Sequence, residues 1–423
     1  MDIVLNLQFN VDFVGIVFSV LSVFVFLSSG IFSFEYMKHE GHHKRYTIFF
    51  CLAFAVFQAL CFADNLITYY FFFEMLTLTT FPLVLHNGSK EATMAGLKYL
   101  FYSLCGAYMA LFGLYFSANS VSFNPAGNMG DVLSKTALDA SGKTTLYLVC
   151  VTLMIFGFGV KAGMFPMHAW LPAAHPVAPA PASAVLSAII VKAGVLGIIR
   201  TVFYVYGSDF IKGSFVQLLW MIITLTTVFM GSMLAFREDG LKKRLAYSTV
   251  SQVSYILFGL STLNDEGFKG ALLQVVAHGV VKCGLFLCAG AIIYKTGKTK
   301  VSQLRGIGKQ MPITMMCFTV LSLSLIGIPP TGGFVSKWYL AIGSLSCGVN
   351  VINWLGPVVL LVSALLTAGY LLPISMRGFF PGDDFDAENC ENLEPNMLMT
   401  VPIIVLTVLA VVIGLFPTLI VNI

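Results

Sequence analysis

Long apolar stretches separated by short polar segments run along almost the whole chain of 423 residues. Runs of about 18–25 predominantly apolar residues are typical of helices that cross a membrane. We therefore predict an all-α polytopic membrane protein with about twelve transmembrane helices. The predicted spans are 12–34, 46–63, 65–86, 95–118, 145–166, 179–205, 214–236, 245–262, 268–294, 312–342, 354–377 and 399–421.

The composition agrees with this pattern. Hydrophobic residues make up 57% of the chain and charged residues only 10%, whereas a soluble domain carries roughly a quarter charged residues. The net charge of +4 comes without a basic stripe, which excludes a nucleic-acid-binding protein. The nine cysteines show no C-x-x-C spacing, so we expect no metal site, redox centre or other cofactor in this chain.

The basic residues of the predicted loops gather on one side of the membrane. Fifteen lie in loops after odd-numbered spans and five lie on the other side. Because basic loops face the cytoplasm, we expect both termini to lie outside. The five are Lys135, Lys143, Arg200, Lys212 and Lys269, and the fifteen are Lys38, Lys44, Arg45, Lys90, Lys98, Arg237, Lys242, Lys243, Arg244, Lys295, Lys298, Lys300, Arg305, Lys309 and Arg377.

Apart from residues near the span ends, the basic ones of which we assign to the loops, five charged residues fall inside the predicted spans, namely Glu74, Lys161, Lys192, Lys282 and Lys337. A charge at the centre of a bilayer costs about 2.5–3.5 kcal/mol on insertion scales. One glutamate cannot neutralise four lysines. Buried ion pairs therefore leave at least three lysines unexplained, unless backbone carbonyls or a partner subunit compensate. We interpret the group as functional.

The chemistry that such residues allow is proton transfer. Burial lowers the pKa of a lysine and a nearby carboxylate raises it, so a lysine whose partner moves can bind and release a proton near neutral pH. All four cations are lysine, and arginine would effectively never deprotonate. His278 lies four residues before Lys282 and shares its helix face, so we favour a relay over a purely structural histidine.

Two predicted spans are interrupted by proline and glycine close to a lysine. Lys161 precedes the proline-rich break in GVKAGMFPMHAWLPAAHP, and Lys337 follows the break in IGIPPTGGFVSKW. Broken helices carrying a charge in two matching halves are typical of transporters. His168 and His175 flank the first break without an acidic or thiol partner nearby. We interpret these two histidines as residues at the mouth of a half-channel rather than as metal ligands.

The two breaks divide the chain into matching sets. Spans two to six and seven to eleven make two sets of five, with a lysine on the fourth span of each. An odd number of helices inverts the second copy relative to the first. We predict an N-terminal helix in 1–45, a first repeat in 46–205, a second repeat in 206–377, and an acidic loop with a C-terminal helix in 378–423. The acidic residues are Asp383, Asp384, Asp386, Glu388, Glu391 and Glu394, which we interpret as a solvated loop or a partner contact.

Five stretches resemble, in the same order, motifs of a known family. It comprises the antiporter-like subunits of respiratory complex I and the large subunits of Mrp-type Na⁺/H⁺ antiporters and membrane-bound hydrogenases. The stretches are FFFEMLTLTTFPLV, GVKAGMFPMHAWLPAAHPVAPAPASAVLSA, REDGLKKRLAYSTVSQVSY, AHGVVKCGLFLCAGAII and IGIPPTGGFVSKW. The resemblance covers nearly the whole chain.

The resemblance implies a role for each buried charge. Glu74 matches a carboxylate that couples one subunit to its neighbour, Lys161 matches its partner, and Lys192 matches the next relay residue. His278 and Lys282 match the central axis between two half-channels. Lys337 matches the exit-side residue, which is glutamate in some relatives.

The resemblance also implies a proton-translocating subunit of a redox-driven membrane complex, in the cytoplasmic membrane of a prokaryote. Such a chain has no catalytic site of its own, and iron–sulfur or other redox centres are expected in peripheral partner subunits. The neighbours in the membrane would include a second antiporter-like subunit. The family usually has fourteen helices with the glutamate on the fifth, whereas Glu74 lies on the third span here, which leaves the packing against that neighbour open.

Three alternatives remain open at this point. The chain could be the large subunit of an Mrp-type Na⁺/H⁺ antiporter without a redox partner. It could be a structural subunit that does not conduct ions, although all the titratable positions are retained. It could also energise the uptake of bicarbonate.

Overall fold

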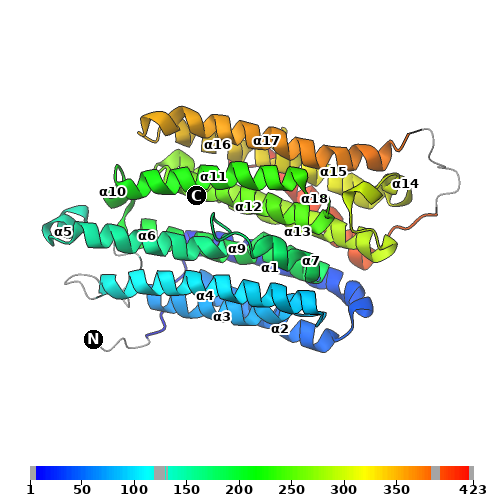
Figure 1. The fold of residues 1–423 in the computed structure, drawn as a ribbon, viewed down its shortest axis with the longest axis horizontal. Coiled ribbons are helices and arrows are strands. Elements are labelled where there is room, and N and C mark those ends of the chain that lie inside the picture. The colour runs from blue at the N-terminus through cyan, green and yellow to red at the C-terminus, as the bar shows by residue number, and fades with distance from the viewer. Residues whose placement is uncertain (1–5, 119–128, 130–131, 383–390, 419–423) are drawn as a thin grey trace.

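The computed structural model describes residues 6–118, 129, 132–382 and 391–418. The described chain is built from helices that lie side by side along the long axis of the molecule (Figure 1). The longer helices are α1 (Phe13–Glu40), α2 (His43–Cys61), α3 (Leu66–Val84), α4 (Lys90–Ala118), α6 (Thr144–Lys161), α11 (Phe215–Arg237), α12 (Leu241–Ser261), α13 (Asp265–Thr296), α15 (Pro312–Ile326), α16 (Gly332–Leu345), α17 (Asn350–Phe379) and α18 (Met397–Leu415).

The helices agree with the predicted spans. In the described part of the chain, ten helical segments are long and apolar enough to cross a membrane. The other two predicted spans are α12, whose first turn carries three basic residues, and the interrupted pair α15 and α16. The prediction of an all-α polytopic membrane protein is confirmed. The division into inverted repeats and the domain boundaries remain predictions.

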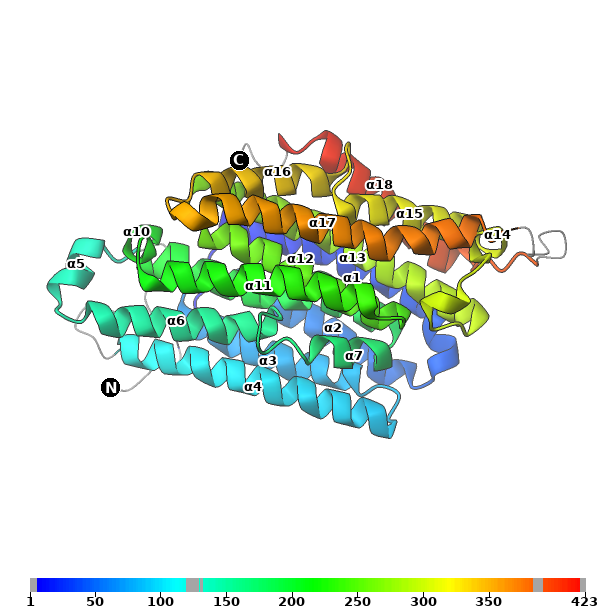
Figure 2. The ribbon, with the colours of Figure 1, turned by 45° about the horizontal axis from the view of Figure 1, so that its top comes forward.

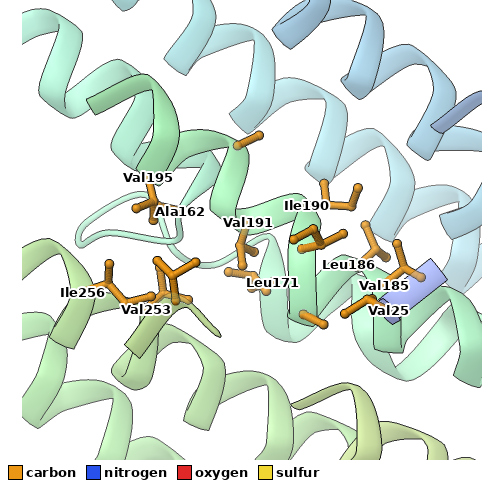
Figure 3. Packing of buried hydrophobic residues seen from close by; sticks show 14 of the residues in the cluster. Val25, Ala162, Leu171, Val185, Leu186, Ile190, Val191, Val195, Val253 and Ile256 are labelled. Atoms are coloured by element: carbon orange, nitrogen blue, oxygen red, sulfur yellow. The ribbon is translucent and has the colours of Figure 1, made fainter. Parts of the chain in front are cut away.

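The centre of the bundle is formed by α13 and by the segment Ala180–Tyr206. This segment consists of α8 (Ala180–Val185), α9 (Val191–Ile199) and two π-helical stretches, η1 (Leu186–Ile190) and η2 (Arg200–Tyr206). This segment is completely buried throughout the apolar stretch that could cross the membrane. Figure 3 shows its apolar side chains beside those of α12 and α1. These central helices carry three of the predicted proton-transfer residues.

The turned view in Figure 2 shows α6 and α7 (Leu171–Val177) in line beside α4, and α15 and α16 in line beside α17. In the first break, α6 ends at Lys161 and the chain turns through residues 162–170 before α7. In the second break, Gly327 ends α15 with a φ of 93°, which only glycine adopts readily. Both interruptions lie where proline and glycine predicted them.

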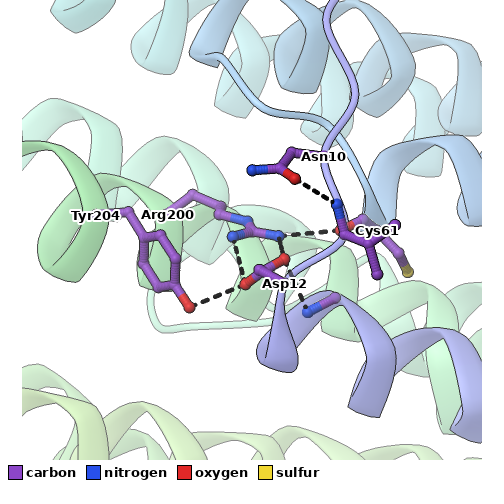
Figure 4. Close-up of polar contacts among 7 residues, drawn as sticks. Asn10, Asp12, Cys61, Arg200 and Tyr204 are labelled. Carbon is purple, nitrogen blue, oxygen red and sulfur yellow. Dashed lines mark hydrogen bonds and ion pairs between the residues drawn. The ribbon is translucent and has the colours of Figure 1, made fainter. Parts of the chain in front are cut away.

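Arg200 corrects one prediction. It was expected in a loop, but it lies in η2 and is 2% exposed. Its guanidinium binds Asp12 through Nη1–Oδ2 at 2.8 Å and Nη2–Oδ1 at 2.5 Å, and Tyr204 donates to the same carboxylate at 2.9 Å (Figure 4). Nη2 also donates to the carbonyl of Cys61 at 3.0 Å. Because its charge is paired, an arginine is tolerated inside the bundle.

Lys242 was also expected in a loop, and it too is buried, with 8% exposure in the first turn of α12. Of the acidic residues near the C-terminus, Asp383, Asp384, Asp386 and Glu388 lie outside the described residues. Glu391 is exposed. Glu394 differs from it, because its carboxylate accepts hydrogen bonds from the backbone and hydroxyl of Thr314 at 3.0 and 2.8 Å.

Candidate functional site

Lys161 lies at the end of α6, where the first break begins. Its ammonium donates to the hydroxyls of Thr77 at 2.8 Å and Tyr99 at 2.7 Å. It also lies 5.7 Å from the ring centre of Phe73 and 4.7 Å from that of Tyr99. The side chain is 1% exposed. Hydroxyls and aromatic faces thus replace water around this lysine.

Glu74 lies on α3 between Phe73 and Thr77, both of which contact Lys161. It is half-buried, and within the described chain its Oε1 has no hydrogen-bond partner. Among the described residues, no ion pair of 4.0 Å or less joins Glu74 to Lys161. The two groups nevertheless interact electrostatically. The predicted pair is therefore close but not in contact.

Lys192 and His278 meet at the centre of the bundle. Nζ of Lys192 lies 2.8 Å from Nδ1 of His278, and it donates to the carbonyl of Ser187 at 3.4 Å. Both side chains are almost fully buried. Nε2 of His278 has no partner among the described residues. A proton held by this pair can thus leave through the free nitrogen of the ring.

Lys282 lies one turn along α13 from His278. Its ammonium donates to the carbonyl of Leu245 at 2.9 Å and to the hydroxyl of Ser248, both on α12. The side chain is 0% exposed. No carboxylate lies within ion-pair distance of Lys282 in the described residues, so neutral oxygens alone hold its ammonium.

A chain of amides and a hydroxyl continues from this centre toward the second break. Gln274 lies one turn before His278 on α13, and its Nε2 donates to Oε1 of Gln252 at 2.9 Å. The hydroxyl of Ser336 donates to Oε1 of Gln274 at 2.5 Å. Sequence reasoning missed these three residues. The spacing of Gln274, His278 and Lys282, each four residues apart, was the signal that could have found the first of them.

Lys337 follows Ser336 on α16. Its ammonium donates to the carbonyls of Leu325 and Ile326 at 2.6 and 2.7 Å, and it lies 5.2 Å from the ring centre of Tyr255. The carbonyls belong to the last turn of α15, where a helix offers unpaired acceptors and the negative end of its dipole. The second break therefore positions this lysine through the backbone.

The two histidines of the first break lie in different surroundings. His168 is half-buried and stacks on Phe165 at 6.0 Å between ring centres. His175 on α7 is 0% exposed and stacks on Phe286 at 4.7 Å. Neither ring nitrogen of His175 has a hydrogen-bond partner in the described chain. No group of three or more potential ligands that could hold a metal ion occurs among the described residues.

The sequence matches one known protein family and is similar to several proteins of known complexes. The family described as "NADH:quinone oxidoreductase/Mrp antiporter, TM" matches residues 63–371. NADH-quinone oxidoreductase subunit N of Desulforudis audaxviator (strain MP104C) is 33% identical, over 94% of this chain and 79% of the relative. A Na(+)/H(+) antiporter subunit of Bacillus subtilis (strain 168) is 28% identical, over 87% of this chain and 71% of the relative.

The fold is similar to that of solved structures. A chain of the Mrp complex from Dietzia sp. DQ12-45-1b superimposes with a TM-score of 0.85 at 22% identity, covering 98% of this chain and 82% of that chain. At this identity, the likeness shows that the fold is shared. The relatives are thus subunits of multisubunit membrane complexes. The chain belongs to the transmembrane family of NADH:quinone oxidoreductases and Mrp antiporters.

Proposed function

We propose that this chain is a proton-translocating, antiporter-like subunit of a multisubunit redox-driven membrane complex. The observation that carries the proposal is the row of buried and half-buried titratable residues from α6 to α16. Lys161 comes first, Lys192 and His278 are in contact at the centre, Lys282 lies one turn away, and Lys337 closes the row. Such residues are expensive in a membrane, and they mark ion pathways and proton relays.

The protonation of Lys161 would respond to the position of Glu74. When the carboxylate approaches, Coulomb attraction stabilises the ammonium, and when it withdraws, the proton is released toward the central pair. Glu74 is half-buried, so its exposed part is placed to answer a neighbouring antiporter-like subunit, while its buried Oε1 has no hydrogen-bond partner among the described residues. Gln252, Gln274 and Ser336 would order the water that carries the proton onward to Lys337.

The energy would come from partner subunits. A relative is a subunit of an NADH-quinone oxidoreductase, and we propose peripheral partners that hold iron–sulfur or other redox centres. This chain would supply no catalytic site. We further propose the cytoplasmic membrane of a prokaryote, with the basic loops inside and both termini outside.

The test uses the complex purified through a tag on this chain and reconstituted into vesicles. We expect Lys161→Ala to lower proton pumping by at least about tenfold, since no neighbouring group can replace the ammonium. Lys309→Ala, at an exposed lysine of α14 (Ile307–Gln310), should pump normally. Undiminished pumping by an intact Lys161→Ala complex would contradict the proposal.

A second candidate is the large subunit of an Mrp-type antiporter without a redox partner, favoured by the similarity to the antiporter subunit of Bacillus subtilis. The subunits that purify with the chain separate the two. Redox turnover that drives pumping supports the first proposal. Sodium efflux driven by an imposed proton gradient, from a complex without redox subunits, supports the second.

A further inference from the structure

A polar pocket of about 530 Å³ opens on the side of the basic loops. It forms where the ends of α1, α7 and α13 meet the turn between α11 and α12. Its walls include both signs of charge. The charged residues of the wall are Glu40, Glu238, Asp239, Lys242, Lys243 and Lys300.

Two adjacent lysines border this pocket in different ways. Lys243 points to solvent, with a side chain 44% exposed, and pairs with Glu238 at 2.8 Å. Lys242 points inward, and its ammonium donates to the carbonyl of Ala178 at 2.9 Å. Lys242 therefore lies between the water of the pocket and the interior.

Behind Lys242 lies His175. It is three residues before Ala178, it is fully buried, and both its ring nitrogens lack partners in the described chain. It lies within electrostatic range of both Lys242 and Lys282. Buried polar groups are nearly always satisfied by protein or by water, so these free nitrogens are placed to bind water on either side of the ring.

The oxygens that hold Lys282 continue the same line. Lys242, Leu245 and Ser248 follow one another every three residues on α12 and share one helix face. The carbonyl of Leu245 and the hydroxyl of Ser248 accept from Lys282. One face of α12 thus runs from the pocket to the central lysine.

We propose that Lys242 and His175 take up protons from this pocket and deliver them to Lys282. The inference rests on the proposed function and names its uptake site. A hydronium ion in the water of the pocket gives a proton to the amine of Lys242 and becomes water. The resulting ammonium passes one proton through water to His175, and the imidazolium passes one to the amine of Lys282. Each step moves a single proton, and each donor returns to its neutral form.

The experiment compares Lys242→Arg, Lys242→Gln and Lys243→Gln in the purified complex in vesicles. Arginine keeps the charge and the hydrogen bond to Ala178, but it does not release a proton at physiological pH. We expect both Lys242 variants to lower pumping by about tenfold or more. The matched control, Lys243→Gln, should stay within about twofold of the parent complex.

Three results would overturn the proposal. Normal pumping by Lys242→Arg would show that Lys242 only donates a structural hydrogen bond, and an equal loss in Lys243→Gln would show a general effect of surface charge. His175→Gln is the second variant, should the first not assemble, and normal pumping by it also contradicts the proposal. Lys161→Ala in the same preparation separates the two proposals. If it abolishes pumping while Lys242→Arg pumps normally, only the uptake site is wrong.

Discussion

The lysines beside the two helix breaks are held by different kinds of oxygen. Lys161 binds the hydroxyls of Thr77 and Tyr99, whereas Lys337 binds the carbonyls of Leu325 and Ile326. A carbonyl only accepts hydrogen bonds, while a hydroxyl can also donate one. The first site can therefore satisfy a lysine nitrogen as a donor or as an acceptor. The second site can satisfy it only as a donor.

The two sites are therefore suited to different roles: the first can change the protonation of Lys161, and the second holds Lys337 in a fixed position. At the first break, side chains can rotate as the proton leaves, so the site adapts without moving the backbone. At the second break, the lysine depends on the shape of the last turn of α15. Both lysines keep an aromatic face nearby, that of Tyr99 at 4.7 Å and that of Tyr255 at 5.2 Å between nitrogen and ring centre.

The largest effect is expected from Gly333→Ala at the second break. A Cβ on Gly333 would lie 1.8 Å from the carbonyl oxygen of Ser324, which is backbone and cannot rotate away. We expect a loss of about 3 kcal/mol in the free energy of unfolding, measured as a lower thermal midpoint of the purified complex. Gly30→Ala is the control, because its Cβ would make only an ordinary contact of 3.6 Å with Phe50. Equal midpoints for both variants would contradict a backbone-positioned site.

The next effect separates the two tyrosines. Tyr99→Phe removes a hydroxyl that contacts Lys161 and Thr80, and we expect pumping to fall roughly tenfold. The hydroxyl of Tyr255 donates to the carbonyl of Leu360 instead, so Tyr255→Phe keeps the ring beside Lys337 and should pump within about twofold of the parent. Proton pumping in vesicles measures both. The comparison fails if the two variants lose pumping equally.

The smallest effect is expected from Glu394→Gln. Its carboxylate accepts both hydrogen bonds from Thr314 near the start of α15, and a carboxylate at a helix N-terminus is favoured by the helix dipole. We expect a loss of about 1 kcal/mol in the free energy of unfolding, seen in chemical denaturation. Glu391→Gln, at an exposed position nearby, is the control. A loss of proton pumping without a matching loss in the free energy of unfolding would assign Glu394 a role beyond anchoring α15.

The succession of membrane-spanning helices and the two helix breaks could be predicted from the sequence. Hydropathy gives the length of each apolar run, and proline and glycine mark both breaks, because these properties are local. By contrast, the residues that contact each other across neighbouring helices can be far apart in the sequence. Arg200 is satisfied by Asp12, 188 residues away in the chain, and no window around Arg200 contains that partner.

The same limit applies to the candidate site. The buried charges could be named from the sequence, since each stands alone in an apolar run. The neutral partners could not, because serine, tyrosine and glutamine occur in membrane helices without a cost that makes them conspicuous. Lys242 was missed for the opposite reason. It belongs to a basic cluster, and only its inward hydrogen bond to Ala178 distinguishes it from Lys243.

The helix α13 has 32 residues, which makes it about 48 Å long. The hydrocarbon core of a bilayer is about 30 Å thick, so both ends of this helix reach past it. Gln274, His278 and Lys282 lie on one continuous helix without a proline between its ends. A displacement of either helix end along the axis would therefore move all three side chains together, and it would change their distances to Lys192, Leu245 and Ser248 on the neighbouring segments.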